Sequence, residues 1–191
     1  MTYQTIVLEQ PAELPVTLTE VKTHVRMPLD LDDDDALIMS YVASATKYVE
    51  RRCAQRFVTQ TLRTTFEGWT PRIKSVYLPW APVASVVRMA NVVDGSEVDV
   101  DLDAYGVTLG VPGAIARRVF GCVPVDAVVV DYVVGYGLAA SVPAEVKLPV
   151  MILAGHWYAR REPVITGTIV SECPMHVNDL IGGLRWGAYP A

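Results

Sequence analysis

The chain has 191 residues, of which 51% are apolar, and a formal net charge of −5. This length and composition predict a folded globular chain of one domain, or of a small domain that carries an insert, and they exclude a disordered chain. The acidic balance argues against tight, non-specific DNA binding, because such binding requires a basic surface that neutralises phosphates.

The apolar residues are distributed in short runs, and none approaches the roughly 20 residues of a membrane-spanning helix. The first residues, Met1 to Ile6, lack the basic and apolar regions of a signal peptide. Three widely separated cysteines, Cys53, Cys122 and Cys173, suit reduced thiols better than a disulfide framework. We therefore expect a chain that is made and folded in a cytoplasm and has no membrane partner.

The first third of the chain predicts an extended arm and two helices. Residues 1–17 contain two prolines and suggest the arm. A short helix starts at Leu18, where Thr19 can cap the free backbone N–H groups, and Pro28 disfavours its continuation. A second helix follows an acidic run of four aspartates and ends near Arg51, so that both charges complement the helix dipole. Its apolar stripe consists of Leu37, Ile38, Tyr41, Val42, Ala45, Tyr48, Val49 and Cys53.

Residues 57–137 change in character and predict short strands. The runs rich in β-branched and aromatic residues are 57–66, 73–78, 83–93, 105–109, 114–119 and 127–134. Glycine and proline separate these runs, and Asp94-Gly95 is the strongest hairpin signal among them. The spacing predicts a small β-sandwich or barrel.

Helical character returns at Pro143, which fits a first-turn position. Apolar residues then recur at helical spacing as far as Tyr158, although Pro149 should kink this helix or split off its first turn. The predicted fold class is therefore α+β. It has an α-helical core formed by residues 18–56 and 138–162, an inserted small antiparallel β domain over residues 57–137, and an extended C-terminal tail over residues 163–191.

The sequence carries no recognisable catalytic motif, so we expect no enzyme, no cofactor and no metal. Cys173 and His176 could supply two metal ligands, whereas a structural zinc site needs four. The acidic alternation from Glu97 to Asp103 lacks the glycine and the closing glutamate of a calcium loop, and it is better explained as a strand with a solvated acidic face.

The end of the late helix, residues 156–162, changes from apolar to aromatic to charged. Arg160 and Arg161 can end the helix against its dipole, or they can contact the carboxylates of a neighbouring subunit, since arginine is enriched at interfaces. This pattern suggests a component of an assembly.

An ordered series of short phrases resembles the head–tail connector, or adaptor, family of tailed bacteriophages and gene transfer agents. The phrases are Leu18-Thr19-Glu20-Val21-Lys22, Asp34-Asp35-Ala36-Leu37-Ile38, Thr61-Leu62-Arg63, Phe66-Glu67-Gly68-Trp69, Leu78-Pro79, Pro82-Val83, Asp131-Tyr132-Val133-Val134-Gly135-Tyr136-Gly137 and His156-Trp157-Tyr158-Ala159-Arg160-Arg161-Glu162. The resemblance runs from about residue 18 to residue 186, which is nearly the whole chain.

The resemblance implies a non-catalytic structural protein of the virion, located at the head–tail junction. Such a protein would form a ring, typically of twelve copies, below the portal protein, and it would dock the next tail or stopper component. Double-stranded DNA would pass through the lumen without sequence-specific binding, which suits the acidic balance. The residues we expect at the portal or subunit interface are Arg160, Arg161, Glu162, Ile181, Leu184, Arg185 and Trp186.

The alternative is a β-domain binding module, for instance a tail or surface component that recognises protein or carbohydrate. Its contact candidates would be Trp69, Tyr77 and Trp80, provided that their side chains are exposed.

Overall fold

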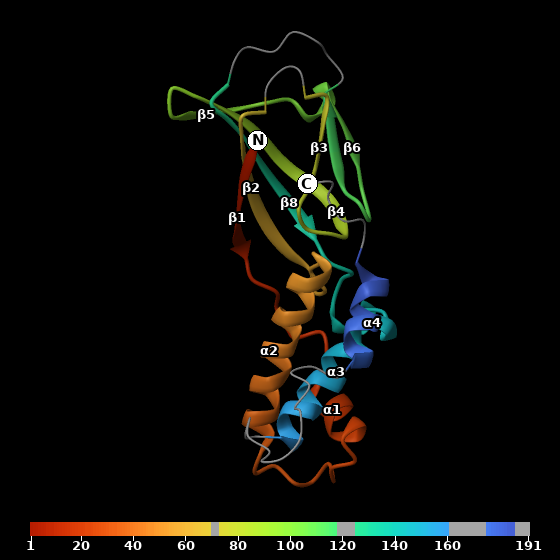
Figure 1. Ribbon diagram of the computed structural model, residues 1–191. Coiled ribbons are helices and arrows are strands. Elements are labelled where there is room, and N and C mark those ends of the chain that lie inside the picture. Colours follow the sequence, from red (N-terminus) through yellow and green to blue (C-terminus); the bar gives the residue numbers. More distant parts are fainter. Residues whose placement is uncertain (70–72, 118–124, 161–174, 186–191) are drawn as a thin grey trace. The chain divides into compact units, whose positions relative to one another are not determined.

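A computed structural model describes residues 1–69, 73–117, 125–160 and 175–185. The chain divides into two units, and each is formed by two segments of the sequence (Figure 1). Met1–Ala12 and Thr59–Tyr136 form one unit, which contains every strand of the described residues and is called the β unit below. Glu13–Val58 and Gly137–Ala191 form the other, which contains the described α-helices and is called the helical unit.

The β unit consists of two antiparallel sheets. One has the strand order β1-β2-β8-β4-β5 and the other has the order β3-β7-β6. The strands are β1 Thr2–Glu9, β2 Gln60–Glu67, β3 Ser75–Tyr77, β4 Val83–Val93, β5 Ser96–Asp99, β6 Tyr105–Thr108, β7 Ala114–Arg117 and β8 Ala127–Val134. The short 3₁₀ helix η1, Leu102–Ala104, precedes β6.

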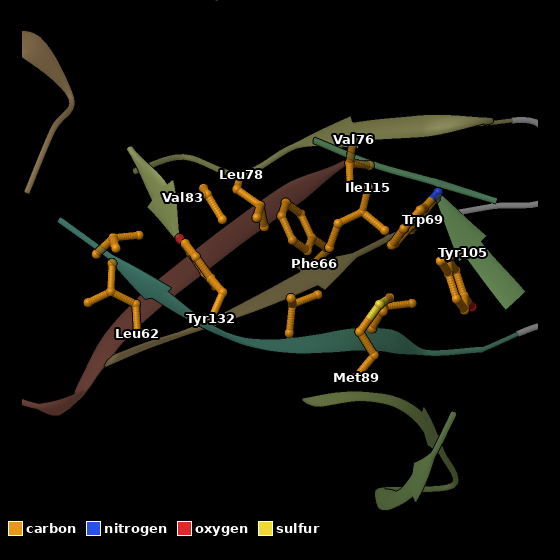
Figure 2. Close-up of a cluster of buried hydrophobic side chains, with 13 residues drawn as sticks. Leu62, Phe66, Trp69, Val76, Leu78, Val83, Met89, Tyr105, Ile115 and Tyr132 are labelled. Atoms are coloured by element: carbon orange, nitrogen blue, oxygen red, sulfur yellow. The ribbon is translucent and has the colours of Figure 1, made fainter. Parts of the chain in front are cut away.

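Both sheets contribute side chains to one apolar core (Figure 2). Phe66 and Trp69 meet edge to face with ring centroids 6.1 Å apart, and Trp69 is also 6.1 Å from Tyr105. Strand β2 alternates strictly between buried and half-buried positions until its last residue, which explains why its apolar side chains all reach this core. The buried members are Leu62, Phe66, Trp69, Val76, Leu78, Val83, Met89, Tyr105, Ile115, Val128, Val130, Tyr132 and Val134.

The structure corrects the expectation of a small inserted β domain. Strand β1 comes from the first residues of the chain and pairs with β2 along its whole length, so the β unit is larger than one insert. The Asp94-Gly95 hairpin is confirmed, because β4 and β5 pair from Val93 and Ser96 onward and both turn residues have positive φ angles, 50° and 76°.

The helical unit contains α1 Leu18–His24, α2 Asp35–Cys53, α3 Ala144–Ala159 and α4 Met175–Leu184, with the 3₁₀ helix η2, Ala139–Ser141, before α3. Helix α2 packs against α3, as its apolar stripe predicts. The buried side chains of α2 include Ile38, Val42, Ala45, Val49 and Cys53. Gly155 of α3 allows a close approach, since a Cβ at this position would lie only 2.9 Å from Cγ1 of Val25.

Helix α3 continues through Pro149, which is buried, so of the two predicted alternatives the splitting of the first turn does not occur. One expectation for the helices requires correction. The C-terminal residues are not only an extended tail, because α4 forms within them and packs on α2 and α3. Among the described residues, no helix is both long and apolar enough to cross a membrane.

The cap of α1 also differs from the prediction, since Thr17 caps this helix in place of Thr19. Glu20 N–H donates to Thr17 Oγ1 at 3.3 Å, and Thr17 N–H donates to Glu20 Oε2 at 2.7 Å, which completes a capping box. Lys147 Nζ binds the second oxygen of Glu20 at 2.8 Å. Burial tends to raise the pKa of Glu20, but the contacts with Lys147 and Thr17 outweigh it and lower the pKa.

We expect Thr17→Ala to lower the free energy of unfolding by about 1 kcal/mol, because the replacement removes the cap. Thr19→Ala is the matched control and should change this free energy by less than about 0.5 kcal/mol, since Thr19 is exposed. Urea unfolding followed by circular dichroism measures both variants. Equal effects of the two replacements would contradict the assigned cap.

The contribution of the Glu20 carboxylate to stability should depend on pH. Because the pKa of Glu20 is lowered in the fold, this contribution should be present at neutral pH and be lost as the pH falls below about 4.5.

Candidate assembly surfaces

The residues predicted for the interface fall at the ends of α3 and α4. Arg160 is exposed and ends α3, where its N–H donates to the carbonyl of His156 at 3.0 Å. Arg185 is exposed and Leu184 is half-buried at the end of α4. Arg161, Glu162 and Trp186 lie outside the described residues. The structure therefore provides two exposed arginines for outside contacts, one after each helix.

Ile181 has a different environment from the one expected of a free tail. It is buried together with Val177, one turn earlier on α4, and both belong to the core of the helical unit. Gln55 Nε2 donates to the carbonyl of Leu184 at 2.7 Å and so fixes the end of α4. Ile181 therefore holds α4 in place, and the exposed residues beside it remain available for contacts.

Lys22 stabilises the connection between α1 and α2, which is residues 25–34. Its side chain is almost fully buried, and Nζ donates to the carbonyls of Leu29 at 3.3 Å and Leu31 at 2.6 Å. The same Nζ lies 2.6 Å from Oδ1 of Asp35, at the start of α2. This role of Lys22 could not be predicted from the sequence, because a lysine in a short helix ordinarily faces solvent.

The aromatic end of α3 reaches the same connection. Tyr158 donates its hydroxyl proton to Oδ2 of Asp34 at 2.7 Å. Two of the five aspartates before and at the start of α2, Asp34 and Asp35, are thus held by side chains of α3 and α1. The other three, Asp30, Asp32 and Asp33, are exposed, and none of them forms an ion pair with a described residue.

Helix α2 presents one continuous face to solvent. Its exposed residues recur every three or four positions, which places them on one side of the helix. They are Ala36, Ser40, Ser44, Lys47 and Arg51. Arg52 lies beside this stripe and rests over the ring of Tyr48, with its guanidinium carbon 5.2 Å from the ring centroid. The stripe therefore starts with small residues and ends with basic ones.

The C-terminal end of α2 is fixed by Glu50. Its buried carboxylate accepts the N–H of Phe57 at 2.9 Å and a guanidinium N–H of Arg56 at 2.9 Å. Burial raises the pKa of Glu50 in spite of these contacts. Ala54, with a φ angle of 55°, ends the helix in the left-handed conformation. The residues around Glu50 have a structural role, since each contact is internal.

The Cys53 thiol is buried in the same region and donates to the carbonyl of Val49 at 3.0 Å. Burial raises its pKa from 9.0 to about 11. In a chain with Cys122→Ser and Cys173→Ser, we expect a disulfide reagent at pH 8 to modify Cys53 about 100-fold more slowly in the native chain than in urea, since the thiolate is the reacting form. Equal rates in the two conditions would show that this end of α2 is open to solvent.

The β unit carries a network of ion pairs on one face of its five-stranded sheet. Arg63 of β2 and Arg88 of β4 both stand opposite Asp131 of β8. Arg63 binds the two oxygens of Asp131 at 2.7 and 2.8 Å, which raises the pKa of Arg63. Arg88 binds Glu97 at 2.6 Å and Asp99 at 2.8 Å. Glu97 and Asp99 of β5 are exposed, as the prediction of a strand with a solvated acidic face requires, and both also pair with Arg88.

The aromatic residues of the alternative hypothesis do not form one exposed surface. Trp69 is buried in the core of the β unit, and its indole N–H donates to the carbonyl of Ile73 at 2.9 Å. Trp80 is half-buried and packs against the same core. Only Tyr77 of the three is exposed, at 49%. A binding module built on these residues therefore loses two of its three contact candidates.

The described residues offer no metal centre, because no three or more histidine, cysteine, aspartate or glutamate side chains gather among them in a way that could hold an ion. Cys122 and Cys173 lie outside the described residues, and nothing is described of the His176 side chain. The charged side chains predicted for contacts, Arg160 and Arg185, are exposed at the ends of α3 and α4.

Comparison with known protein families matches residues 15–101 to the family described as "Phage gp6-like head-tail connector protein". This segment includes α1, α2 and strands β2 to β5. Over these residues, the chain is similar to the head–tail connector family. The resemblance inferred from the sequence is confirmed, and it points to a structural family without enzymatic activity.

Solved structures extend the similarity of the fold over the whole chain. A chain of the "Neck of empty GTA particle", with C6 symmetry, is 22% identical and has a TM-score of 0.79, with 97% of each chain covered. A chain of the "Virion of native gene transfer agent (GTA) particle" is 21% identical and has a TM-score of 0.79. The alignment covers 97% of this chain and 96% of that one. A chain of the "Neck of native GTA particle", with C12 symmetry, is 22% identical, with a TM-score of 0.74 and coverage of 99% and 97%. No curated protein matches the chain.

Proposed function

We propose that the chain is a structural head–tail adaptor in the neck of a phage or gene transfer agent particle. Copies of it form a ring below the portal protein, extend the DNA channel and dock the next tail or stopper component. The observation that carries this proposal is the match of the first half of the chain to connectors, together with a fold shared over 97% of its length with a neck protein. The adaptor has no catalytic role.

The necks that contain a chain of the same fold were computed with C6 and with C12 symmetry, and a ring of twelve copies is compatible with both. We therefore propose a dodecamer. Its acidic subunits carry a formal net charge of −5 each, which repels DNA phosphates and allows DNA to pass without being held. The portal contacts we propose include Arg160 and Arg185, because both are exposed at helix ends and neither ion-pairs with a described residue.

The portal contact is tested best with single charge reversals, because deleting residues 163–191 would remove the buried Val177 and Ile181 as well as the contact residues. We expect Arg160→Glu and Arg185→Glu each to weaken binding of purified portal at least about 10-fold, the effect of losing roughly 1.4 kcal/mol of interface energy. Circular dichroism should show an unchanged fold. Asp179→Lys, at an exposed position of α4, is a control for changes of charge. Portal binding at wild-type strength by both arginine variants would exclude these residues from the contact.

A further inference from the structure

Exposed charges of opposite sign lie at the two ends of α2. At the C-terminal end, Lys47 and Arg51 are exposed, and neither forms an ion pair with a described residue. At the other end, the connection before the helix exposes Asp30, Asp32 and Asp33, which are likewise without ion pairs among the described residues. Since α2 has 19 residues, about 28 Å separates the two ends. They are too far apart to neutralise each other within one chain.

The acidic connection before α2 also exposes apolar side chains. Leu29 and Leu31 alternate with the aspartates and are 59% and 43% exposed. Lys22 holds the carbonyls of both leucines, so the connection has a fixed conformation in which these side chains point outward. Exposed leucines between carboxylates are suited to contact another protein, because such a contact removes their apolar surface from water.

The basic end of α2 offers a surface that fits such a segment. The stripe before it is made of small residues, and the hydroxyls of Ser40 and Ser44 already donate to backbone carbonyls of α2, at 2.7 and 2.9 Å. A neighbouring chain can therefore approach this face closely without leaving a buried hydroxyl unsatisfied. Lys47 and Arg51 lie one turn apart on the same face, within reach of carboxylates on that neighbour.

Identical subunits in a ring meet through two different patches that fit each other, and every copy carries both. We propose that residues 29–33 of one copy dock on the Lys47–Arg51 face of α2 of the next copy. This inference rests on the proposed ring and names the contact that closes it. Exposed charge pairs of this kind mainly select the partner and the register, so ring formation should weaken as salt rises.

Complementary charge reversals test this contact. The basic-face variant is Lys47→Glu with Arg51→Glu, and the acidic-segment variant is Asp32→Lys with Asp33→Lys. Each variant alone places like charges at every subunit contact, and we expect its ring fraction on size-exclusion chromatography with light scattering to fall at least 10-fold. An equimolar mixture restores opposite charges at every contact of an alternating ring. We therefore expect the mixture to form rings that contain the two variants in equal numbers.

Glu145→Lys with Asp179→Lys is the control, since it changes the net charge by as much as the acidic-segment variant and lies elsewhere on the helical unit. It should form rings as the wild type does. Single variants that still form rings, or a mixture that stays monomeric, would overturn the contact while the ring itself stands. A mixture that stops at dimers would indicate antiparallel pairing of two α2 helices and would also overturn it. A wild-type chain that forms no ring, with or without portal, would overturn the proposed function together with this inference.

Discussion

Trp69→Ala should lower the free energy of unfolding of the β unit by about 3–5 kcal/mol, the cost of truncating a large buried aromatic side chain. The indole is 2% exposed and contacts the rings of Phe66 and Tyr105. Its removal also leaves the carbonyl of Ile73 without its side-chain donor. Urea unfolding followed by circular dichroism measures the loss, and hydrogen exchange of the β8 amides assigns it to the β unit.

Tyr77→Ala is the matched control, because Tyr77 belongs to the same unit and is 49% exposed. Its effect on the unfolding free energy should stay within about 0.5 kcal/mol, apart from the small loss expected for an aromatic residue in a strand. A small effect of Trp69→Ala would contradict the core assignment and would return Trp69 to the list of possible ligand contacts. The pair of variants therefore tests whether Trp69 belongs to the core or is available as a ligand contact.

Lys22→Met should have the second large effect, a loss of about 3 kcal/mol from the stability of the helical unit. The replacement keeps the apolar stem and removes the ammonium group that binds Asp35 and two carbonyls. Breaking a buried ion pair costs about 3–5 kcal/mol, and the lower end applies because the Asp35 side chain is partly exposed. Thermal and urea unfolding measure the change.

Lys147→Met provides the comparison, since Lys147 binds Glu20 at a similar distance, 2.8 Å, and the side chains of this pair are 12% and 36% exposed, against 3% for Lys22 and 28% for Asp35. A partly exposed pair contributes about 0–1 kcal/mol, so this variant should be nearly as stable as the wild type. Equal losses of unfolding free energy in the two variants would mean that the buried contacts of Lys22 contribute no more to stability than the partly exposed pair of Lys147. Lys22→Met should also weaken ring formation, because Lys22 fixes the position of the acidic segment.

The elements that the sequence predicted well are those with a local signal. The helical spacing of apolar residues in α2 and the alternation of side chains in β2 can each be recognised within one short stretch of sequence. Both elements form where these patterns lie. The cap of α1 was misplaced by two residues, because threonine occurs at both positions and only the return contact from Glu20 distinguishes them.

The side chains that sequence reasoning missed depend on contacts between distant residues. Asp131 is a single acid in a run of valines, and only the strand register brings Arg63 and Arg88 opposite it. The burial of Lys22 likewise depends on where the chain turns after α1. An acidic residue within an apolar strand could have been taken as a signal for basic partners, because an unpaired buried charge is costly. The family resemblance, by contrast, required no contact to be known.

The most direct test of the adaptor is to image portal vertices of heads that lack this protein, before and after the purified chain is added. The account predicts that added chain appears as a closed ring below the portal, with twelve copies around the DNA channel, and that such heads then accept tails. Vertices that remain unchanged at saturating protein, or chain bound as isolated copies elsewhere on the particle, would contradict it.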